Sequence, residues 1–208
     1  LLLHDNIYKV ANVDWQGGDF SYNQNYVRHA KTGFDAAHIA MQDVNLGIDS
    51  FLYAAPKIRL RVRTANMKEK SGLIVKDFRG PFSMDSTSIN LRDLYFRLPN
   101  TELSGRFMMD INAFADKNPG QISTQLYGFL RLEDLHPFLT SIPKNIYQAI
   151  PNQSIIIKGQ LDGNLRSAAF KQLRLTMPGY FELTGTGWIA DMMSGVGHLR
   201  SDLKLKGT

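Results

Sequence analysis

The stretch closest to a known chemical motif is GTGWIA, at residues 185–190, which fits the G-x-G-x-x-A pattern of dinucleotide-binding turns. That pattern requires a helix whose N-terminus faces the pyrophosphate. Here the alternation of apolar and polar residues continues through the motif, and DMMSGVG, which follows, is typical of a turn. We therefore expect a strand and no nucleotide site, with the glycines on the crowded face of a sheet.

The titratable residues lack the spacing of a catalytic or metal site. Cysteine is absent, and no two histidines have ligand spacing such as H-x-x-x-H. Glu133 and Asp134 are adjacent where a helix should begin, so capping and the helix dipole explain them better than acid–base chemistry. Glu102 and Glu182 belong to the polar side of a structural repeat. We expect no enzymatic activity, metal or cofactor. The five histidines are His4, His29, His38, His136 and His198.

Composition restricts the class of protein. The 208 residues carry a formal net charge of +5, with 43% hydrophobic and 21% charged residues, which is ordinary for a folded chain. The positive charge lies on strand-like runs without interleaved aromatics, so we expect no nucleic-acid partner. No run reaches the roughly 18 apolar residues of a membrane-spanning helix. The chain begins with LLLHDN, without a methionine, and we expect it to be an internal slice of a longer protein.

The dominant pattern is strict alternation, which is typical of an antiparallel sheet with one wet face. In KIRLRVRTA, at residues 57–65, Ile58, Leu60 and Val62 share one face and three arginines share the other. Several such runs exceed the usual five or six residues of a strand, so we expect long strands in an extended sheet. Further runs, separated by turn signals, cover residues 104–115, 122–132, 154–166, 170–177, 181–189 and 199–205.

One segment departs from this alternation. Residues 132–151 have apolar side chains at steps of three and four, which predicts helix. Pro137 and Pro143 are expected in first turns, where proline fits a helix best. We predict two short helices, the second ending before Pro151. A weaker helical or turn segment covers residues 33–39.

Two distant stretches repeat: RLPNTELSGRF at residues 97–107 and TMPGYFELTGTG at residues 176–187. Aligned on Pro99 and Pro178, each copy is a strand, a hairpin turn and a return strand. Such repeats are typical of stacked units that cover one another's apolar faces. The matched positions before the prolines are Leu94 with Leu173, Phe96 with Leu175 and Leu98 with Met177; after a one-residue insertion in the second copy, they are Leu103 with Leu183 and Gly105 with Gly185.

The apolar face of these strands has two interpretations. It is either the closed core of packed layers or the lining of an open trough, and alternation places leucines identically in both. A trough for apolar ligands requires a smooth lining without buried charge, and the inward sets meet that description. The candidate lining residues are Ile58, Leu60, Val62, Ile89, Leu91, Leu94, Phe96, Leu98, Leu103, Phe107, Met109, Ile111, Leu126, Leu130, Ile155, Ile157, Leu161, Leu173, Leu175, Phe181, Leu183 and Ile189.

The arrangement of three stretches resembles the AsmA-like family, in particular its TamB branch. They are GFDAAHIAMQDVNLGIDSF at residues 33–51, KIRLRVRTANMKEKSGLIVKDFRG at 57–80 and SIIIKGQLDGNLRSAAFKQLRLTMPGYFELTGTGWI at 154–189. The resemblance covers most of the chain from about Phe34 onward. The first thirty or so residues fit as preceding strands without a motif.

The resemblance implies an all-β, repeat-built fold, the β-taco: a U-shaped trough of long antiparallel strands, here with a small helical insert. It implies the periplasmic part of an inner-membrane-anchored envelope protein, with the anchor outside this chain. The expected parts are leading strands and a turn segment at 1–37, a first β repeat segment at 38–132, the insert at 133–151 and a second β repeat segment at 152–208. All belong to one continuous domain.

The function that the resemblance implies is conduction of phospholipids between the inner and outer membranes, or support of outer-membrane biogenesis. The expected ligands are phospholipid acyl chains, and an outer-membrane barrel protein is a second candidate partner. One alternative is an interaction scaffold whose strand edges pair with another protein. Another is a closed β-sandwich that binds carbohydrate or peptide, with Tyr180 and Trp188 in an outward aromatic cluster.

Overall fold

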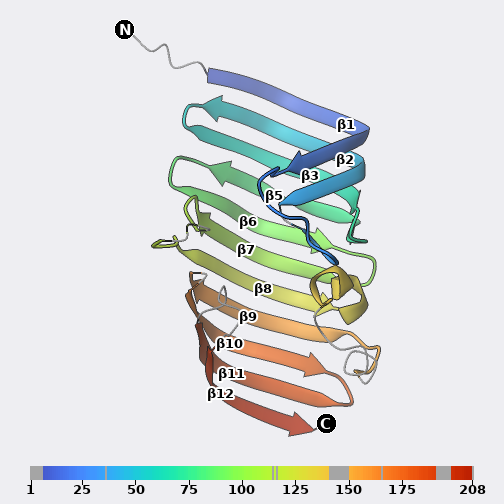
Figure 1. The fold of residues 1–208 in the computed structure, drawn as a ribbon, viewed down its shortest axis with the longest axis vertical. Helices are drawn as coiled ribbons and strands as arrows, with labels where there is room; N and C mark the ends of the chain where they lie inside the picture. The colour runs from blue at the N-terminus through green and yellow to red at the C-terminus, as the bar shows by residue number, and fades with distance from the viewer. Residues whose placement is uncertain are drawn as a thin grey trace.

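The structure, a computed structural model, describes residues 7–35, 37–113, 115, 117–140, 150–164, 166–190 and 198–207. Within these ranges it consists of strands and one short 3-10 helix, η1 (Leu132–Phe138) (Figure 1). The strands are β1 (Ile7–Asn23), β2 (His38–Ala54), β3 (Lys57–Glu69), β4 (Ile74–Val75), β5 (Asp77–Met84), β6 (Ser88–Arg97), β7 (Glu102–Asp110), β8 (Ile122–Leu130), β9 (Ile155–Gly163), β10 (Ser167–Met177), β11 (Phe181–Ala190) and β12 (His198–Gly207).

All twelve strands form one antiparallel sheet in which neighbours in sequence are neighbours in space, except that β4 lies off the path and pairs with β3. The sheet is curved and open, with β1 and β12 at its two edges (Figure 1). The predicted fold class, an all-β trough of long antiparallel strands with a small helical insert, is confirmed. Strands on either side of the insert join directly, because β8 pairs with β9.

The two longest strands, β1 and β2, bend together, so that their ends joined by residues 24–35 lie in front of the sheet in Figure 1. The register is irregular at the bend: it shifts between Trp15 and Gly18, and Asp43 has a left-handed φ of 53°. Bulges of this kind turn a strand and increase its twist. The bend carries the connecting segment to η1, where the rings of Phe34 and Phe138 lie 5.1 Å apart.

Three bulges lie at nearly the same level of the sheet, and those in β6 and β10 share one level. Ser50 in β2, Asp93 in β6 and Gln172 in β10 have φ values of 57°, 47° and 49°. Each adds one residue to its strand relative to a neighbouring strand. The left-handed conformation costs a non-glycine residue roughly 1–2 kcal/mol, so the surrounding pairing must impose it. Because a bulge bends its strand, bulges at one level curve the sheet along a single line.

The helical insert differs from its prediction. Pro137 is the sixth residue of the seven in η1, not part of a first turn, and a proline there favours a short 3-10 turn over a continuing α-helix. The predicted second helix falls on residues 141–149, which lie outside the described residues. Asp134 does not cap η1 through its side chain; it accepts the backbone N–H of Asn100, 2.7 Å away in the turn between β6 and β7.

Residues 33–39, predicted as a helical or turn segment, contain turns and the start of β2 where they are described. The Asp35 carboxylate accepts backbone N–H groups from Ala30 at 2.9 Å and Ala37 at 3.1 Å. A short carboxylate that bonds nearby N–H groups competes with helical hydrogen bonding. The turn interpretation is therefore the correct one for this part.

The sequence repeat corresponds to two equivalent hairpins, β6–β7 and β10–β11. Leu98 and Met177, the residues before the two prolines, are among the most buried side chains described, with 2% and 1% of their surface exposed. The predicted strand at 104–115 ends earlier, since β7 stops at Asp110 and the chain then turns. Ile111, predicted as a strand residue of the lining, lies in this turn and is exposed.

Candidate functional site

One face of the sheet is apolar along its length; we call it the apolar face and define it by four rows of cross-strand neighbours. Each row crosses the eight strands from β5 to β12. Only Thr124 and Ser201 in these rows have a hydrogen-bonding side chain, and no residue in them is charged. The rows are Met84, Ile89, Met109, Ile122, Gly163, Ala168, Ile189, Leu199; Phe82, Leu91, Phe107, Thr124, Leu161, Phe170, Gly187, Ser201; Gly80, Leu94, Gly105, Leu126, Gly159, Leu173, Gly185, Leu203; and Phe78, Phe96, Leu103, Gly128, Ile157, Leu175, Leu183, Leu205.

The third of these rows alternates glycine and leucine without interruption over eight strands, and we call it the Gly–Leu row. Every second position has no side chain, whereas larger side chains dominate the flanking rows. The row therefore has fewer side-chain atoms than either flanking row, and it runs across the strands, along the long axis of the sheet (Figure 1). Seven spacings of about 4.8 Å give it a length of about 34 Å.

Close backbone packing explains why glycine occupies this row. A Cβ on Gly105 would lie 1.9 Å from the carbonyl oxygen of Gln125 in β8, and the φ of Gly105 is +158°. A side chain would have to displace the backbone of the neighbouring strand, because real Cβ contacts are never this short. The glycines thus combine two effects: they let strands approach closely and they thin the lining.

The side chains of the apolar face are more shielded from solvent than the apolar side chains on the opposite face. From β3 to β11, the apolar-face residues within the strands are half-buried or buried. On the opposite face Tyr127 is 58% exposed and Trp188 is 43% exposed, and Met108, Phe129 and Ile156 are exposed as well. Side chains crowd together on the concave side of a curved sheet and spread apart on the convex side. Within the described residues, no second sheet covers the apolar face.

The structure brings the predicted lining residues together on this face. Fourteen of the twenty-two belong to the four rows, and Ile58, Leu60 and Val62 of β3 pair with the β5 members Met84, Phe82 and Gly80. Ile111 alone lies in a turn past the end of its strand. Four more lie at the end of the face nearest η1, where Leu130 pairs with Ile155. Those four are Leu98, Leu130, Ile155 and Phe181.

Sequence reasoning missed the contribution of β5 and of the edge strand β12 to the apolar face. Phe78, Phe82 and Met84 alternate as a strand requires, but Pro81 lies between them, and a proline argues against a central strand. In β12 the inward Leu199, Leu203 and Leu205 are exposed because β12 is an edge strand of the described sheet. Alternation was the signal that could have identified all of them.

The opposite face carries charged side chains, among them Arg59, Arg61 and Arg63 as predicted, beside the exposed apolar side chains named above. Arg63 forms ion pairs with Asp49, at 2.6 Å, and with Asp14. Near the bulge at Asp93, this face has a hollow of about 730 Å³. The outward side chains around the hollow are Asn90, Tyr95, Arg106, Met108, Gln125 and Tyr127.

Two motifs from the sequence do not form the sites they resemble. Residues 185–190 are part of β11, so the motif itself lies in a strand and not in the turn and helix start that a dinucleotide site needs. Tyr180 lies in the turn before β11, whereas Trp188 lies near its other end and pairs with Ala169. They form no aromatic cluster together.

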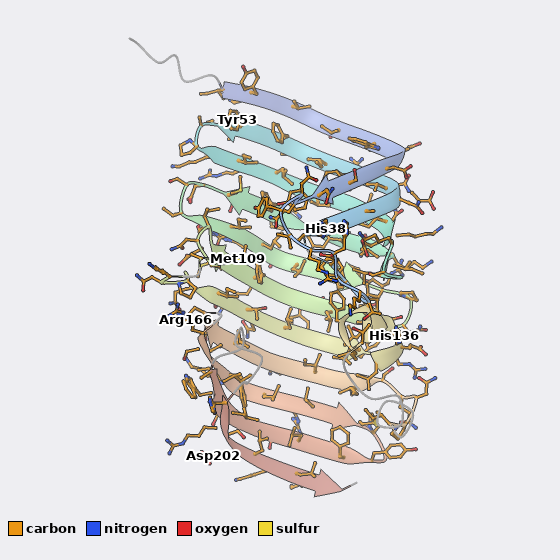
Figure 2. All side chains as sticks on the ribbon, viewed as in Figure 1. His38, Tyr53, Met109, His136, Arg166 and Asp202 are labelled. Carbon is orange, nitrogen blue, oxygen red and sulfur yellow. The ribbon has the colours of Figure 1, made fainter. Side chains whose placement is uncertain are left out.

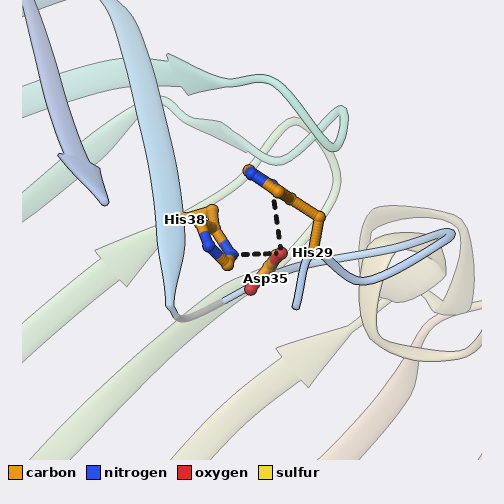
Figure 3. Close-up of side chains that lie close together, drawn as sticks. All are labelled: His29, Asp35 and His38. Carbon is orange, nitrogen blue, oxygen red and sulfur yellow. Dashed lines mark hydrogen bonds and ion pairs between the residues drawn. The ribbon is translucent and has the colours of Figure 1, made fainter. Parts of the chain in front are cut away.

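The structure also assembles a cluster that sequence spacing did not reveal: His29, Asp35 and His38, in and after the segment joining β1 and β2 (Figure 3). His38 Nδ1 lies 2.9 Å and His29 Nδ1 4.0 Å from Asp35 Oδ2. The two imidazole rings stack with centroids 3.6 Å apart. The pKa of Asp35 lies below its usual value, mainly because its carboxylate accepts a hydrogen bond from the backbone N–H of Ala30. Figure 2 places His38 on the front side of the sheet.

Compared with family models, curated proteins and solved structures, the chain gives no match in any of the three. None of the helices in the described part of the chain has the length and hydropathy needed to cross a membrane.

Proposed function

We propose that this chain is a hydrophobic groove segment that conducts phospholipids between the inner and outer membranes of a bacterial envelope. It would be the periplasmic part of a longer protein anchored in the inner membrane. The observation that carries the proposal is the uncharged apolar face, which runs unbroken over eight strands and is covered by no second sheet in the described part of the chain. The resemblance to the TamB branch of the AsmA-like family supports the same function.

The energetics of lipid transfer require such a surface. Each methylene withdrawn from water contributes about 0.8 kcal/mol, so a sixteen-carbon chain contributes roughly 12 kcal/mol. A lipid tail crossing an aqueous gap alone would lose this contribution. A lining of aliphatic and aromatic side chains restores most of this free energy. Met84 and Met109 add flexible side chains that can adapt to acyl chains of different length and shape.

The direction of the Gly–Leu row agrees with conduction rather than with binding at one place. A lipid tail that lies along the row meets the same alternation of glycine and leucine every two strands. Equivalent positions have similar affinity, so a tail moves along the row without a deep energy minimum. The zwitterionic or anionic headgroup would remain at the open side of the sheet, in water.

Native mass spectrometry of the purified 208-residue chain tests this function. The wild-type chain is expected to retain phospholipid. Leu126→Asp puts a charge into the Gly–Leu row and should lose the lipid, because a lipid tail that covers a carboxylate removes the charge from water at a high cost in free energy. Gln125→Asp adds the same charge on the opposite face one residue away and should retain it. Equal lipid content in all three proteins would contradict the proposal.

A second function, an interaction scaffold, is favoured by the two open edges. β1 offers 17 residues and β12 offers 10 residues along edges that no described strand covers. Unpaired edge strands bind extended segments by strand addition. This function predicts that proline substitutions in β12 abolish partner binding, whereas Leu126→Asp leaves it intact.

A further inference from the structure

The cluster of His29, Asp35 and His38 combines three side chains that are ligands for transition metals. Their ligand atoms all lie within 4.8 Å of one another. Two imidazoles and one carboxylate are a common donor set for Zn²⁺, whereas Mg²⁺ and Ca²⁺ prefer oxygen ligands alone. The cluster is separate from the apolar face and plays no part in lipid binding as proposed above.

The distances fit the face of a tetrahedral site. With metal–ligand bonds of 2.0–2.1 Å, two ligand atoms are about 3.3 Å apart. The contacts of Asp35 Oδ2 with His38 Nδ1, at 2.9 Å, and with His29 Nδ1, at 4.0 Å, lie on either side of this value. Figure 3 shows both rings directed at the same carboxylate oxygen. Because a metal lies in the plane of each imidazole that binds it, an ion between them requires the mostly exposed His29 ring to turn out of its stacked position.

The burial of His38 and the hydrogen bonds that hold Asp35 are also typical of a metal site. The Asp35 carboxylate is held by the N–H groups of Ala30 and Ala37, and the side chain of His38 is only 3% exposed. Supporting hydrogen bonds of this kind fix the orientation of metal ligands. The side chain of His29 is 67% exposed, so one side of the cluster is open to solvent, an ion and a completing water.

The two histidines lie beside the same carboxylate oxygen. Their rings stack with centroids 3.6 Å apart, and the Nδ1 atom of each lies within 4.0 Å of Asp35 Oδ2. Imidazole nitrogens and a carboxylate oxygen are the ligands that hold one divalent ion in many protein sites. We propose that His29, Asp35 and His38 form a binding site for a divalent transition-metal ion such as Zn²⁺, which fastens the segment joining β1 and β2.

Titration of the metal-free 208-residue chain with ZnCl₂ by calorimetry tests the proposal. One equivalent of Zn²⁺ should bind in the micromolar range. His29→Ala removes a mostly exposed ligand and should weaken binding by about tenfold or more, with the fold retained by circular dichroism. Co²⁺ in place of Zn²⁺ should give the visible absorption of a tetrahedral site in wild type but not in His29→Ala.

His198→Ala is the matched control, because it removes an exposed histidine on β12, far from the cluster in sequence. It should bind Zn²⁺ as tightly as wild type. The proposal is overturned if wild type binds no zinc, or if His29→Ala and His198→Ala weaken binding equally. A lipid-free protein that binds zinc would contradict the proposed lipid function alone, so the two proposals fail separately.

Discussion

Asp93 and Gln172 have the same left-handed backbone, with φ of 47° and 49°, in strands that occupy equivalent places in the two repeats. Each residue directly precedes the leucine of its strand in the Gly–Leu row, Leu94 or Leu173. The repeat in the sequence therefore encodes more than two hairpins. It encodes a bend at a fixed level, and this bend helps to make the sheet a trough.

The bulge at Gln172 gives the first prediction. Gln172→Ile should lower the free energy of unfolding by roughly 1–2 kcal/mol, because a β-branched residue disfavours positive φ most strongly. Gln172→Gly should be neutral or slightly stabilising, since glycine adopts this conformation freely. Thermal unfolding of both variants measures the difference. Thr186→Ile, on the outward face of β11, is the control and should change stability little; a loss equal to that of Gln172→Ile would show that the bulge is not the cause.

The close approach at Gly105 gives the second prediction. Gly105→Ala should destabilise the chain by several kcal/mol, on the order of 3, because its Cβ would lie 1.9 Å from the Gln125 carbonyl oxygen. Gly207→Ala, where nothing lies within 4 Å of the added Cβ, should leave stability unchanged. Urea unfolding followed by circular dichroism measures both. Equal stability of the two variants would mean that the strands do not approach this closely.

The buried hairpin residues give the third prediction. Leu98→Ala should cost about 2–4 kcal/mol, as is usual for a fully buried leucine, because it leaves a cavity beside the turn. Leu205→Ala, at a leucine that is 70% exposed on the edge strand, should cost well under half as much. Urea midpoints of the two variants make the comparison. A larger loss for Leu205→Ala would contradict the burial of the β6–β7 hairpin.

Asp85 gives a prediction about pH. The Thr87 hydroxyl and the backbone N–H groups of Thr87 and Ser88 lower the pKa of Asp85 from 3.8 to about 2. Because the folded pKa is the lower one, the carboxylate stabilises the fold fully above pH 3.8 and loses this effect as the pH falls toward 2. The melting temperature of wild type should therefore fall more steeply than that of Asp85→Asn between pH 4 and 2. Asp202→Asn, on β12, should follow the wild-type curve; parallel curves for wild type and Asp85→Asn would refute the assignment.

Period-two alternation was sufficient to predict the strands and the side of the sheet on which Leu126, Leu161 and Leu173 lie. This follows from strand geometry, in which every second side chain shares a face whatever the tertiary structure. Alternation did not predict the register, because a shift of two residues preserves the face. The Gly–Leu row became visible only when Leu94 was placed opposite Gly105, and Leu126 opposite Gly159.

Other features depend on contacts that sequence spacing does not encode. His29 and His38 meet because the β1–β2 connection folds back through the turn held by Asp35. The intervals of nine and six residues match no familiar ligand pattern. Pro137 failed as a helix-start signal because a seven-residue 3-10 turn accommodates a proline near its end.

Photo-crosslinking in living cells tests the central claim most directly. A photoreactive phenylalanine analogue at Phe107 faces the apolar side of β7, and the same analogue at Met108 faces the opposite side one residue away. With the protein produced in cells that contain labelled phospholipid, irradiation should attach lipid at position 107 and not at 108. Lipid attached equally at both positions, or at neither, would contradict the assignment of this face as a path for lipids.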